Sequence, residues 1–327
     1  MKFRSLFMFF AACAVGLGLD SCKKDDDSGD TKPSFSGVLS FEIPAFIEAG
    51  QTVTTTPYGA YRKDGGSYGY SWEFNKLRDT TKFENEPETV KGTYTFVVPD
   101  TLASLTVTAT IFGNGYYSSS TSRSFTAVKP KESIPVLLPP SAKSFSDERD
   151  GKKINYVRSG DLDWMIGNLS YAETGAGYSD CDVMKDITGT FYTWDAAIDA
   201  CPDGWRLPTK DEYLTLCGGR FEGAAGSLMV NAYFNEDRMW EYWPEVDITN
   251  KTSFSALPAG YGNFDGEKWS FTGMNEYAAW WTADSFDDDK AKAVYIMLNV
   301  QSPDVALGYG HKEFFGANVR CVRDVRE

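Results

Sequence analysis

Between residue 35 and about residue 128, apolar and polar positions alternate along short runs. These runs are rich in β-branched and aromatic residues and are separated by Gly, Pro, Asn and Asp; they include FSGVLSFEI, YGYSWEF, GTYTFVV, SLTVTATIF and TSRSFTAV. Alternation with a period of two predicts strands that bury one face. About six or seven short strands in such a segment favour an immunoglobulin-like β-sandwich over residues 35–128, with Trp72 packed between the sheets.

A helical period appears later in the chain. Four residues are spaced as one face of a helix: Trp194, Ala197, Ile198 and Cys201. This spacing predicts a short helix that is capped by Thr193 and ended by the turn sequence Pro-Asp-Gly at residues 202–204. Residues 205–207 then predict a brief buried strand, in which Arg206 pairs with a carboxylate.

A second short helix is predicted directly afterwards. Residues 209–212, Thr-Lys-Asp-Glu, have the T-x-x-E form of a capping box. Tyr213, Leu214 and Cys217 share one face of this helix, and Gly-Gly at residues 218–219 ends it. Folding requirements explain these residues, so we interpret the segment as scaffold and assign it no catalytic role.

The segments outside these two regions are polar, rich in proline or continuously apolar. Residues 129–144, KPKESIPVLLPPSAKS, predict a Pro-rich linker, and residues 22–34 predict a polar tether. Near the start, Lys2 and Arg4 precede the uncharged apolar residues 6–19. This arrangement is typical of a secretory signal peptide, here over residues 1–21, and the apolar run is too short for a membrane span.

The end of the signal peptide carries a further pattern. Residues 19–22, Leu-Asp-Ser-Cys, resemble a bacterial lipobox, in which the last cysteine is lipidated. The following Lys-Lys-Asp-Asp-Asp resembles the charged signal that sends Bacteroidetes lipoproteins to the outer face of the outer membrane. The resemblance implies acylation of Cys22, a lipid-anchored and cell-surface location on the outer membrane, and the membrane as a partner. The alternative is an ordinary signal peptide followed by an unmodified cysteine.

Charge and aromatic content narrow the classes of partner. The formal net charge is −14 and the isoelectric point is about 4.7. An acidic chain without a basic stripe repels nucleic acids, so we expect no nucleic-acid partner. Aromatic residues make up 15% of the chain, which suits packing in an all-β protein and also suits surfaces that stack on sugar rings.

Motifs that carry chemistry are scarce. His311 is the only histidine in the sequence, which excludes multi-histidine zinc sites and makes any Ser-His-Asp or Cys-His arrangement depend on this residue. The Gly-rich segments lack the Lys-Ser/Thr ending of a phosphate-binding loop. We therefore predict a non-catalytic protein without a cofactor. A carboxylate pair for glycoside hydrolysis stays open, because 46 residues are acidic.

The cysteines point to structural crosslinks. Cys13 is removed with the signal peptide, and Cys22 is the residue predicted to be lipidated. The remaining four allow three pairings: Cys181, Cys201, Cys217 and Cys321. No C-x-x-C spacing occurs among them, and an exported protein favours structural disulfides over redox or metal pairs.

From residue 145 onward the chain carries five motifs in order: FSDERDGKKINYVRSGDLDWMIGNLSY, GTFYTWDAAIDACPDGWRLPTKDEYLTL, FSALPAGY, AAWWTAD and NVRCVRD. Together they resemble the Fibrobacter succinogenes major paralogous domain, a module of secreted and surface proteins, over residues 145–327. The core of that domain is similar to the C-type lectin-like fold shared with formylglycine-generating enzymes. The resemblance implies an α+β C-terminal domain with two short helices and disulfides, and it carries no assigned activity.

The lectin-like resemblance also implies where crosslinks and ligands lie. It joins the first helix to the last strand through Cys201–Cys321, which leaves Cys181 with Cys217. It places the ligand loops at about residues 220–315. Candidate ligand-binding residues there are aromatic: Trp240, Tyr242, Trp243, Tyr261 and Phe264. Carboxylates in an acidic run of the same region are candidate calcium ligands: Asp287, Asp288 and Asp289.

These observations predict a surface lipoprotein that binds or adheres to an extracellular glycan or protein through its C-terminal loops, with the sandwich as a spacer. Two alternatives remain open. One is an accessory structural component of a cell-surface appendage, which requires an exposed sheet edge. The other is a glycan-active enzyme, which requires two carboxylates that face each other in a cleft.

Overall fold

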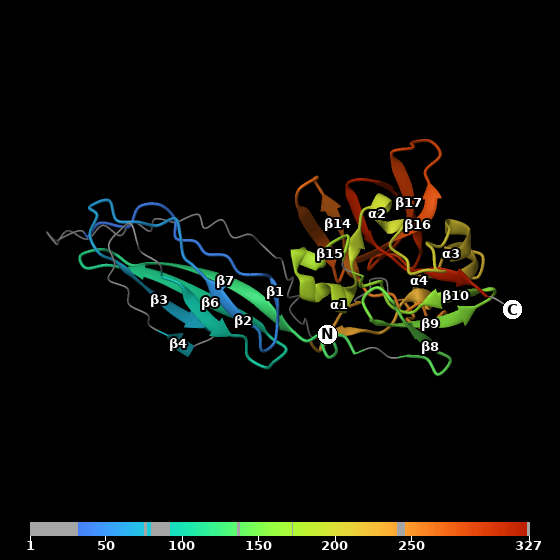
Figure 1. The fold of residues 1–327 in the computed structure, drawn as a ribbon, viewed down its shortest axis with the longest axis horizontal. Helices are drawn as coiled ribbons and strands as arrows, with labels where there is room; N and C mark the ends of the chain where they lie inside the picture. Colours follow the sequence, from blue (N-terminus) through green and yellow to red (C-terminus); the bar gives the residue numbers. More distant parts are fainter. Residues whose placement is uncertain are drawn as a thin grey trace, which may run out of the picture.

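The structure, a computed structural model, describes residues 32–74, 77–79, 92–135, 138–171, 173–240 and 246–325. The predicted signal peptide, Cys22 and most of the predicted tether lie outside these ranges. The described chain is mostly β-strand, with a few short helices and one disulfide bond. Figure 1 shows two units, an N-terminal unit that contains β1 to β7 and a C-terminal unit that contains every later element.

The N-terminal unit consists of two sheets around one core. Its strands are β1 (Phe46–Glu48), β2 (Thr52–Thr55), β3 (Gly69–Phe74), β4 (Leu77–Asp79), β5 (Tyr94–Val97), β6 (Ser104–Phe112) and β7 (Ser119–Val128). Five of them form a sheet in the order β1-β7-β6-β3-β4, and β2 pairs with β5. The alternating run SLTVTATIF becomes β6, in which every second residue from Leu105 to Ile111 is buried.

Trp72 lies in this core, as the sequence predicts. Its side chain is 1% exposed and stacks on the ring of Tyr94 at a centroid distance of 5.1 Å. The indole Nε1–H donates a hydrogen bond to the carbonyl oxygen of Gly92 at 3.1 Å. Because Trp72 belongs to β3 and Tyr94 to β5, this contact joins the two sheets.

A packed interface connects the two units. Val128 at the end of β7 and Ile134 share a buried cluster with five residues of the C-terminal unit: Cys181, Met184, Ile187, Ala232 and Met239. Asn235 crosses the same boundary, since its backbone N–H donates to the Ser133 carbonyl oxygen and its side-chain amide donates to the Ala127 carbonyl oxygen, both at 2.9 Å. The sequence predicts an extended linker from residue 129. The structure instead shows its first residues as a turn packed into this interface.

The C-terminal unit contains two larger sheets. One has the order β20-β10-β9-β8 and is made of β8 (Lys143–Ser146), β9 (Lys153–Ser159), β10 (Leu162–Met165) and β20 (Val322–Asp324). The other has the order β11-β19-β14-β16-β17-β18, with β15 paired to β14. Its strands are β11 (Phe191–Tyr192), β14 (Ala259–Phe264), β15 (Trp269–Met274), β16 (Tyr277–Ser285), β17 (Lys292–Asn299), β18 (Ala306–His311) and β19 (Phe315–Asn318).

Short elements connect these sheets. A two-stranded ribbon pairs β12 (Tyr233–Phe234) with β13 (Asp237–Arg238). The helices are two 3-10 turns, η1 (Tyr178–Asp180) and η2 (Asp182–Met184), followed by α1 (Lys185–Thr188), α2 (Trp194–Ala197), α3 (Lys210–Leu216) and α4 (Ala225–Leu228). The strand β16 lies between two cores, because Trp280 packs into one buried cluster and its neighbour Trp281 into another. Burial of both faces explains the continuous apolar run AAWW.

The helix predictions are confirmed in part. The first helix, α2, is a single turn, and Ile198 is 38% exposed, so this residue does not share the buried face of Ala197. Thr193 occupies the N-cap position without a side-chain cap bond. The second helix, α3, begins with the predicted capping box. The Glu212 N–H donates to Thr209 Oγ1 at 3.2 Å, and the Thr209 N–H donates to Glu212 Oε2 at 2.7 Å.

Arg206 ties this segment to the last strand. Its backbone forms a β-bridge with Val322, with N–H···O distances of 2.9 and 2.8 Å. Its guanidinium binds the Glu212 carboxylate at 2.7 Å and the Asp324 carboxylate at 3.2 Å. The sequence predicts a strand at residues 205–207, and the structure has a single β-bridge there. The carboxylate partner predicted for Arg206 is Glu212.

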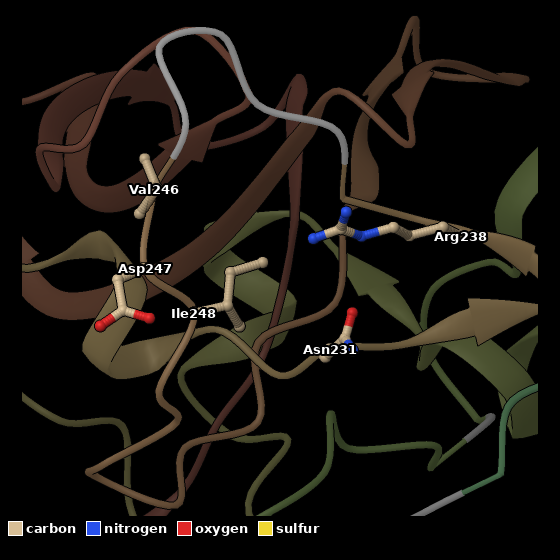
Figure 2. A pocket seen from close by; sticks show the side chains of 5 residues that line it. All are labelled: Asn231, Arg238, Val246, Asp247 and Ile248. Atoms are coloured by element: carbon tan, nitrogen blue, oxygen red, sulfur yellow. The ribbon is translucent and has the colours of Figure 1, made fainter.

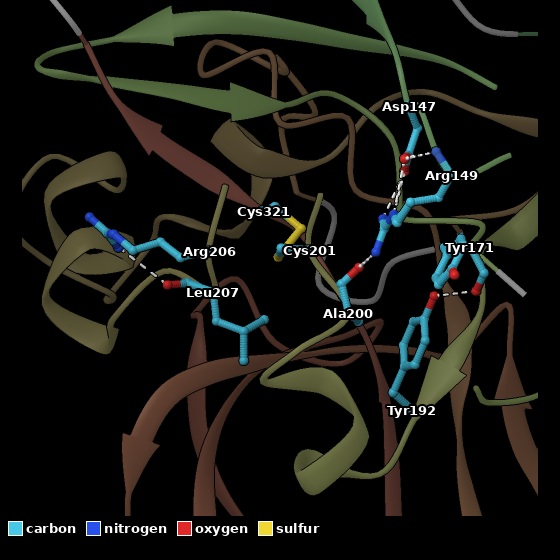
Figure 3. The surroundings of a disulfide bond; sticks show 9 residues. All are labelled: Asp147, Arg149, Tyr171, Tyr192, Ala200, Cys201, Arg206, Leu207 and Cys321. Atoms are coloured by element: carbon cyan, nitrogen blue, oxygen red, sulfur yellow. Dashed lines mark hydrogen bonds and ion pairs between the residues drawn. A yellow bond between two sulfur atoms is a disulfide. The ribbon is translucent and has the colours of Figure 1, made fainter. Parts of the chain in front are cut away.

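The disulfide lies beside this bridge (Figure 3). It joins Cys201 to Cys321, whose Cα atoms are 5.9 Å apart, which is the pair that the lectin-like resemblance implies. The pairing of Cys181 with Cys217 is wrong, because both are free and pack in different clusters. Cys181 faces the N-terminal unit, whereas Cys217 lies at the end of α3. Burial raises the pKa of the Cys217 thiol to about 12.

Figure 3 also shows Arg149, the first residue of the Arg-Asp-Gly motif at residues 149–151. The Arg149 guanidinium binds the buried carboxylate of Asp147 at 2.7 Å and donates to the Ala200 carbonyl oxygen at 2.9 Å. Ala200 directly precedes the disulfide. Arg149 therefore links the loop before β9 to the segment that follows α2.

Arg320, in the NVRCV motif, is a fully buried cation that binds only neutral oxygens within the described residues. These are the carbonyl oxygens of Met165, Ile166, Phe254 and Ser255 and the side-chain oxygen of Asn168. Burial lowers the pKa of its guanidinium to about 9, which leaves Arg320 charged at neutral pH. The motif arginine thereby connects β10 and the loop before β14 to the last strands.

Candidate ligand-binding surface

Four partly buried aromatic side chains form a continuous series of ring contacts across the larger sheet. They come from β14, β16, β17 and β19, and we call them the aromatic row: Tyr277, Tyr261, Phe315 and Tyr295. Their ring centroids are 5.9, 5.6 and 4.5 Å apart in that order. The last two contacts are stacked and the first is edge-on, so the row presents ring faces and ring edges beside each other.

Two glycines of β18 make room for the row. A Cβ atom on Gly308 would lie 2.1 Å from the Tyr295 ring, and a Cβ atom on Gly310 would lie 2.6 Å from the Phe315 ring. Any larger side chain at these positions would push the rings off the strand. The Gly-Tyr-Gly sequence at residues 308–310 is therefore explained by close approach of aromatic rings to the backbone.

A buried tryptophan supports the row from below. The Trp281 ring is fully buried and meets the rings of Tyr295 and Phe315 edge-on, at centroid distances of 5.9 and 5.4 Å. Its Nε1–H donates to the carbonyl oxygen of Tyr192 at 2.8 Å, which fixes the indole in one orientation. Two rings of the row therefore rest on a rigid base.

The row combines apolar rings with hydroxyl groups. Within the part of the chain that the structure describes, the hydroxyls of Tyr261, Tyr277 and Tyr295 have no protein hydrogen-bond partner. Burial raises the pKa of Tyr295, so its hydroxyl stays neutral and can donate a hydrogen bond. Asn263 is exposed two residues after Tyr261 and lies on the same face of β14. Such a surface suits a ligand with an apolar face and polar edges.

The predicted ligand residues are only partly brought together. Tyr261 belongs to the aromatic row, but Phe264 lies on the opposite face of β14, where its ring contacts Trp269 at 5.2 Å. Trp240 is fully buried, and its Nε1–H donates to the Ala256 carbonyl oxygen at 3.0 Å. The prediction of Trp240 as an exposed stacking residue is therefore wrong. The predicted Tyr242 and Trp243 lie outside the described residues.

The acidic run does not form a cation cage. Asp287 pairs with Lys290 at 3.3 Å, and Asp289 pairs with Lys292 at 3.2 Å. Within the described ranges, no three carboxylate, histidine or cysteine side chains come close enough to hold a metal ion. The geometry of the loop thus gives no support to calcium at residues 287–289, because lysines occupy two of the three carboxylates.

A pocket of about 470 Å³ lies in the C-terminal unit (Figure 2). The described residues of its lining are one cation, one carboxylate, one amide and two aliphatic side chains: Arg238, Asp247, Asn231, Val246 and Ile248. In Figure 2 the Arg238 guanidinium extends into the space from one side, while Val246 and Asp247 lie on the other.

A second pocket, of about 370 Å³, is lined by charged residues near the last strand. Its arginines already have a protein partner, because Arg158 and Arg323 both bind the buried carboxylate of Asp163, at 3.2 and 3.0 Å. The Arg323 guanidinium also lies 4.7 Å from the centroid of the Trp205 ring. These contacts hold β9, β10 and β20 together, so we assign this pocket to the scaffold.

Three of the four residues of the row escape prediction from sequence. Tyr277, Tyr295 and Phe315 are far apart along the chain and meet only through the pairing of distant strands. One local signal is present in the sequence. Glycines at the alternate positions 308 and 310 indicate a strand whose backbone is approached closely by large side chains from neighbouring strands. The single histidine, His311, ends β18 and stacks on Phe314 at 4.5 Å, away from the row.

The geometry defines a mostly β chain whose C-terminal motifs fix a disulfide, a capped helix and a buried arginine. A family model described as the Fibrobacter succinogenes major domain matches residues 148–323, more than half of the chain, and the chain belongs to this family. The match covers the C-terminal unit from residue 148, after β8, and leaves the N-terminal unit outside. No curated protein matches the chain. Among the described residues, no helix is both long enough and apolar enough to span a bilayer.

Proposed function

We propose that the protein is a non-catalytic, surface-exposed lipoprotein of the outer membrane, anchored through Cys22, and that its C-terminal unit binds an extracellular glycan through the aromatic row. The row of Tyr277, Tyr261, Phe315 and Tyr295 is the observation that carries the binding proposal. The signal-like residues 1–21 and the lipobox-like sequence before Cys22 support the location. A protein ligand is the alternative for the same surface.

We further propose an immunoglobulin-like sandwich for the N-terminal unit and a C-type lectin-like fold for the C-terminal unit. Two packed sheets with Trp72 between them support the first. The second is supported by two short helices, α2 and α3, on either side of the Arg206 bridge, and by a disulfide from the end of α2 to the last strands. In this arrangement the N-terminal unit serves as a spacer.

The proposed binding is weak for a single site. An aromatic contact contributes roughly 0.5–1.5 kcal/mol, so three partly exposed tyrosines supply about 1.5–4.5 kcal/mol. That free energy corresponds to a Kd of about 0.5 mM or above. Neither of the two pockets described above is lined by a residue of the row. We therefore expect useful affinity to require many copies on a cell surface and a repetitive ligand. A polysaccharide fits both requirements.

The test is a glycan array followed by calorimetric titration of residues 23–327. The variant Tyr261→Ala with Tyr277→Ala removes half of the row. A matched control, Phe264→Ala, removes an aromatic side chain from the other face of the same strand. We expect binding to fall at least tenfold in the first variant and to persist in the second, with or without a chelator. Equal loss in both variants, or no glycan bound by the unaltered chain, contradicts the proposal.

Lipid anchoring is tested separately. Mass spectrometry of the N-terminal peptide from membranes should show acylated Cys22, and Cys22→Ser should release the protein into the soluble fraction. An unmodified N-terminal cysteine in membrane-derived protein contradicts the anchor. This result would leave the binding proposal intact, because the glycan experiment uses the unacylated chain.

One observation favours a second candidate, a structural component of a surface appendage. The strand β18 is at the edge of its sheet and exposes Leu307 and Tyr309, which are 39% and 50% exposed. An apolar sheet edge can accept a further strand from another chain. Analytical ultracentrifugation tests this candidate. The average molecular mass should rise with protein concentration, and Leu307→Lys should abolish the rise. A glycan-active enzyme has less support, since Asp247 is the only acidic residue among the described residues that line the pocket of Figure 2.

A further inference from the structure

The end of the N-terminal unit that lies away from the C-terminal unit is where the described chain begins. We call this end the tip and define it as residues 32–36, 61–68 and 113–118. The Tyr117 N–H donates to the Pro33 carbonyl oxygen at 3.0 Å, and Ser34 pairs with Tyr117. Ser36 pairs in turn with Tyr61. The residues that precede the sandwich therefore reach it at the tip.

The tip and the C-terminal unit lie at opposite ends of β7. Tyr117 is two residues before the start of this strand, whereas Val128 at its end is buried in the interface between the units. A strand of ten residues spans about 33 Å. Figure 1 shows the same arrangement, with the turn between β6 and β7 at the far left and the C-terminal unit on the right.

The tip exposes large side chains. Tyr61 is 51% exposed and Tyr117 is 54% exposed. Along the same edge of the sandwich, Val38 is 80% exposed and Tyr58 is 50% exposed. These four residues are joined by the backbone pairings of residues 34–40 with their neighbours. All four are exposed along the edge of the sandwich that begins at the tip, a position suited to contact with another surface.

The Arg62 side chain holds the tip in one shape. Its guanidinium binds the Asp64 carboxylate at 2.6 Å and donates to the Ser67 carbonyl oxygen at 2.7 Å. It also lies 4.3 Å from the centroid of the Tyr116 ring, so it connects the two loops of the tip. Exposed Tyr61 and Tyr117 are thus presented by an ordered base, which lowers the entropic cost of a contact.

The charge of the tip differs from that of the whole chain. Lys32, Arg62 and Lys63 are basic and Asp64 is acidic, so these four residues carry a net charge of +2, whereas the chain carries −14. A local positive charge suits phosphate groups, and tyrosine is enriched where apolar chains meet water at a membrane surface. Both features match a lipid headgroup layer better than they match another acidic copy of this chain.

We propose that the tip rests on the surface of the membrane, with Tyr61 and Tyr117 in the headgroup layer. This inference rests on the proposed anchor at Cys22. Ten residues separate Cys22 from Pro33, and a chain of that length spans at most about 35 Å. An anchor at Cys22 therefore keeps the tip close to the bilayer, and the contact holds the C-terminal unit at least the length of β7 away from it.

The experiment imposes the anchor independently of acylation. Residues 23–327 carry a hexahistidine sequence in front of residue 23 and are captured on vesicles of phosphatidylethanolamine, phosphatidylglycerol and a nickel-chelating lipid. Hydrogen exchange of the captured protein is compared with that of the same protein free in solution. One variant carries Tyr61→Ser and Tyr117→Ser. The matched control carries Tyr309→Ser, at a tyrosine of similar exposure in the C-terminal unit.

We expect capture to slow exchange of residues 61–68 and 113–118 by roughly threefold or more, with no change at β17 and β18. The slowing should persist in the control and disappear in the tip variant, although both stay captured. Unchanged exchange at the tip of captured, folded protein overturns the proposal. A second result also overturns the proposal: the tip variant loses glycan binding or dimer formation, while capture on vesicles leaves exchange at the tip unchanged. That result assigns the tip to the glycan or to a second copy of the chain. Because capture does not depend on Cys22, failure here is distinct from failure of the lipid anchor.

Discussion

The two units bury their interiors by different means. The N-terminal unit relies on alternation, since β6 buries every second residue and Trp72 fills the space between the sheets. It contains no cysteine. The C-terminal unit instead contains a buried arginine, Arg320, and a disulfide between residues 120 positions apart. Local pattern thus specifies the first unit, whereas contacts between distant residues specify the second.

Removal of the disulfide should produce the largest difference in stability between the two units. Replacing Cys201 and Cys321 by serine opens a loop with a sequence separation of 120, which costs about 5 kcal/mol of unfolding free energy in the chain-entropy description. We expect the calorimetric transition of the C-terminal unit to move to much lower temperature, while that of the N-terminal unit stays. If both transitions move together, the interface couples the units and the contrast fails.

Arg320→Met should have the next largest effect. It leaves several buried carbonyl oxygens without a donor, at a cost of about 3–4 kcal/mol in the stability of the C-terminal unit. The stability of Arg320→Lys should lie between those of Arg320→Met and the unaltered chain, because an ammonium has three donors for five oxygens. Urea unfolding of the three proteins gives the order. A stable Met variant would show that Arg320 is replaceable by apolar packing.

Low pH should lower the stability of the C-terminal unit by a smaller amount than these substitutions do. Hydrogen bonds from Arg149 hold the pKa of buried Asp147 below its ordinary value. A carboxyl with a lowered pKa in the folded state stabilises the protein above its unfolded pKa of about 4, and this stabilisation is lost as the pH falls through the folded value. We expect the C-terminal transition to fall with pH below about 4, and Asp147→Asn to flatten that slope. An identical slope in the variant assigns the acid effect to other groups.

Local signals in the sequence predict local structure well. The T-x-x-E pattern at residues 209–212 predicts the capping box of α3, because both of its hydrogen bonds lie within four residues. The alternation of SLTVTATIF predicts β6 for a similar reason. The family resemblance predicts two further features. These are the Cys201–Cys321 bond, which the structure contains, and the family itself, whose model matches residues 148–323.

Contacts between distant segments are less accessible from the sequence. The exposed-loop role predicted for Trp240 is wrong because its ring packs into the core that also contains residues of β16 and α3. The pairing of Cys181 with Cys217 is wrong because the interface with the N-terminal unit buries Cys181. The aromatic row depends on which strands pair, and nothing local to Tyr277 or Tyr295 specifies that.

The direction of the first segment of the sandwich has a mechanical consequence. Residues 34–48 run parallel to β7, from the Ser34–Tyr117 pair to the pairing of β1 with residues 126–128. A pull between the membrane and a ligand held by the C-terminal unit therefore draws these two segments in opposite directions along their length. The backbone hydrogen bonds between them are then strained together in shear, not opened one after another, so this edge of the spacer resists force.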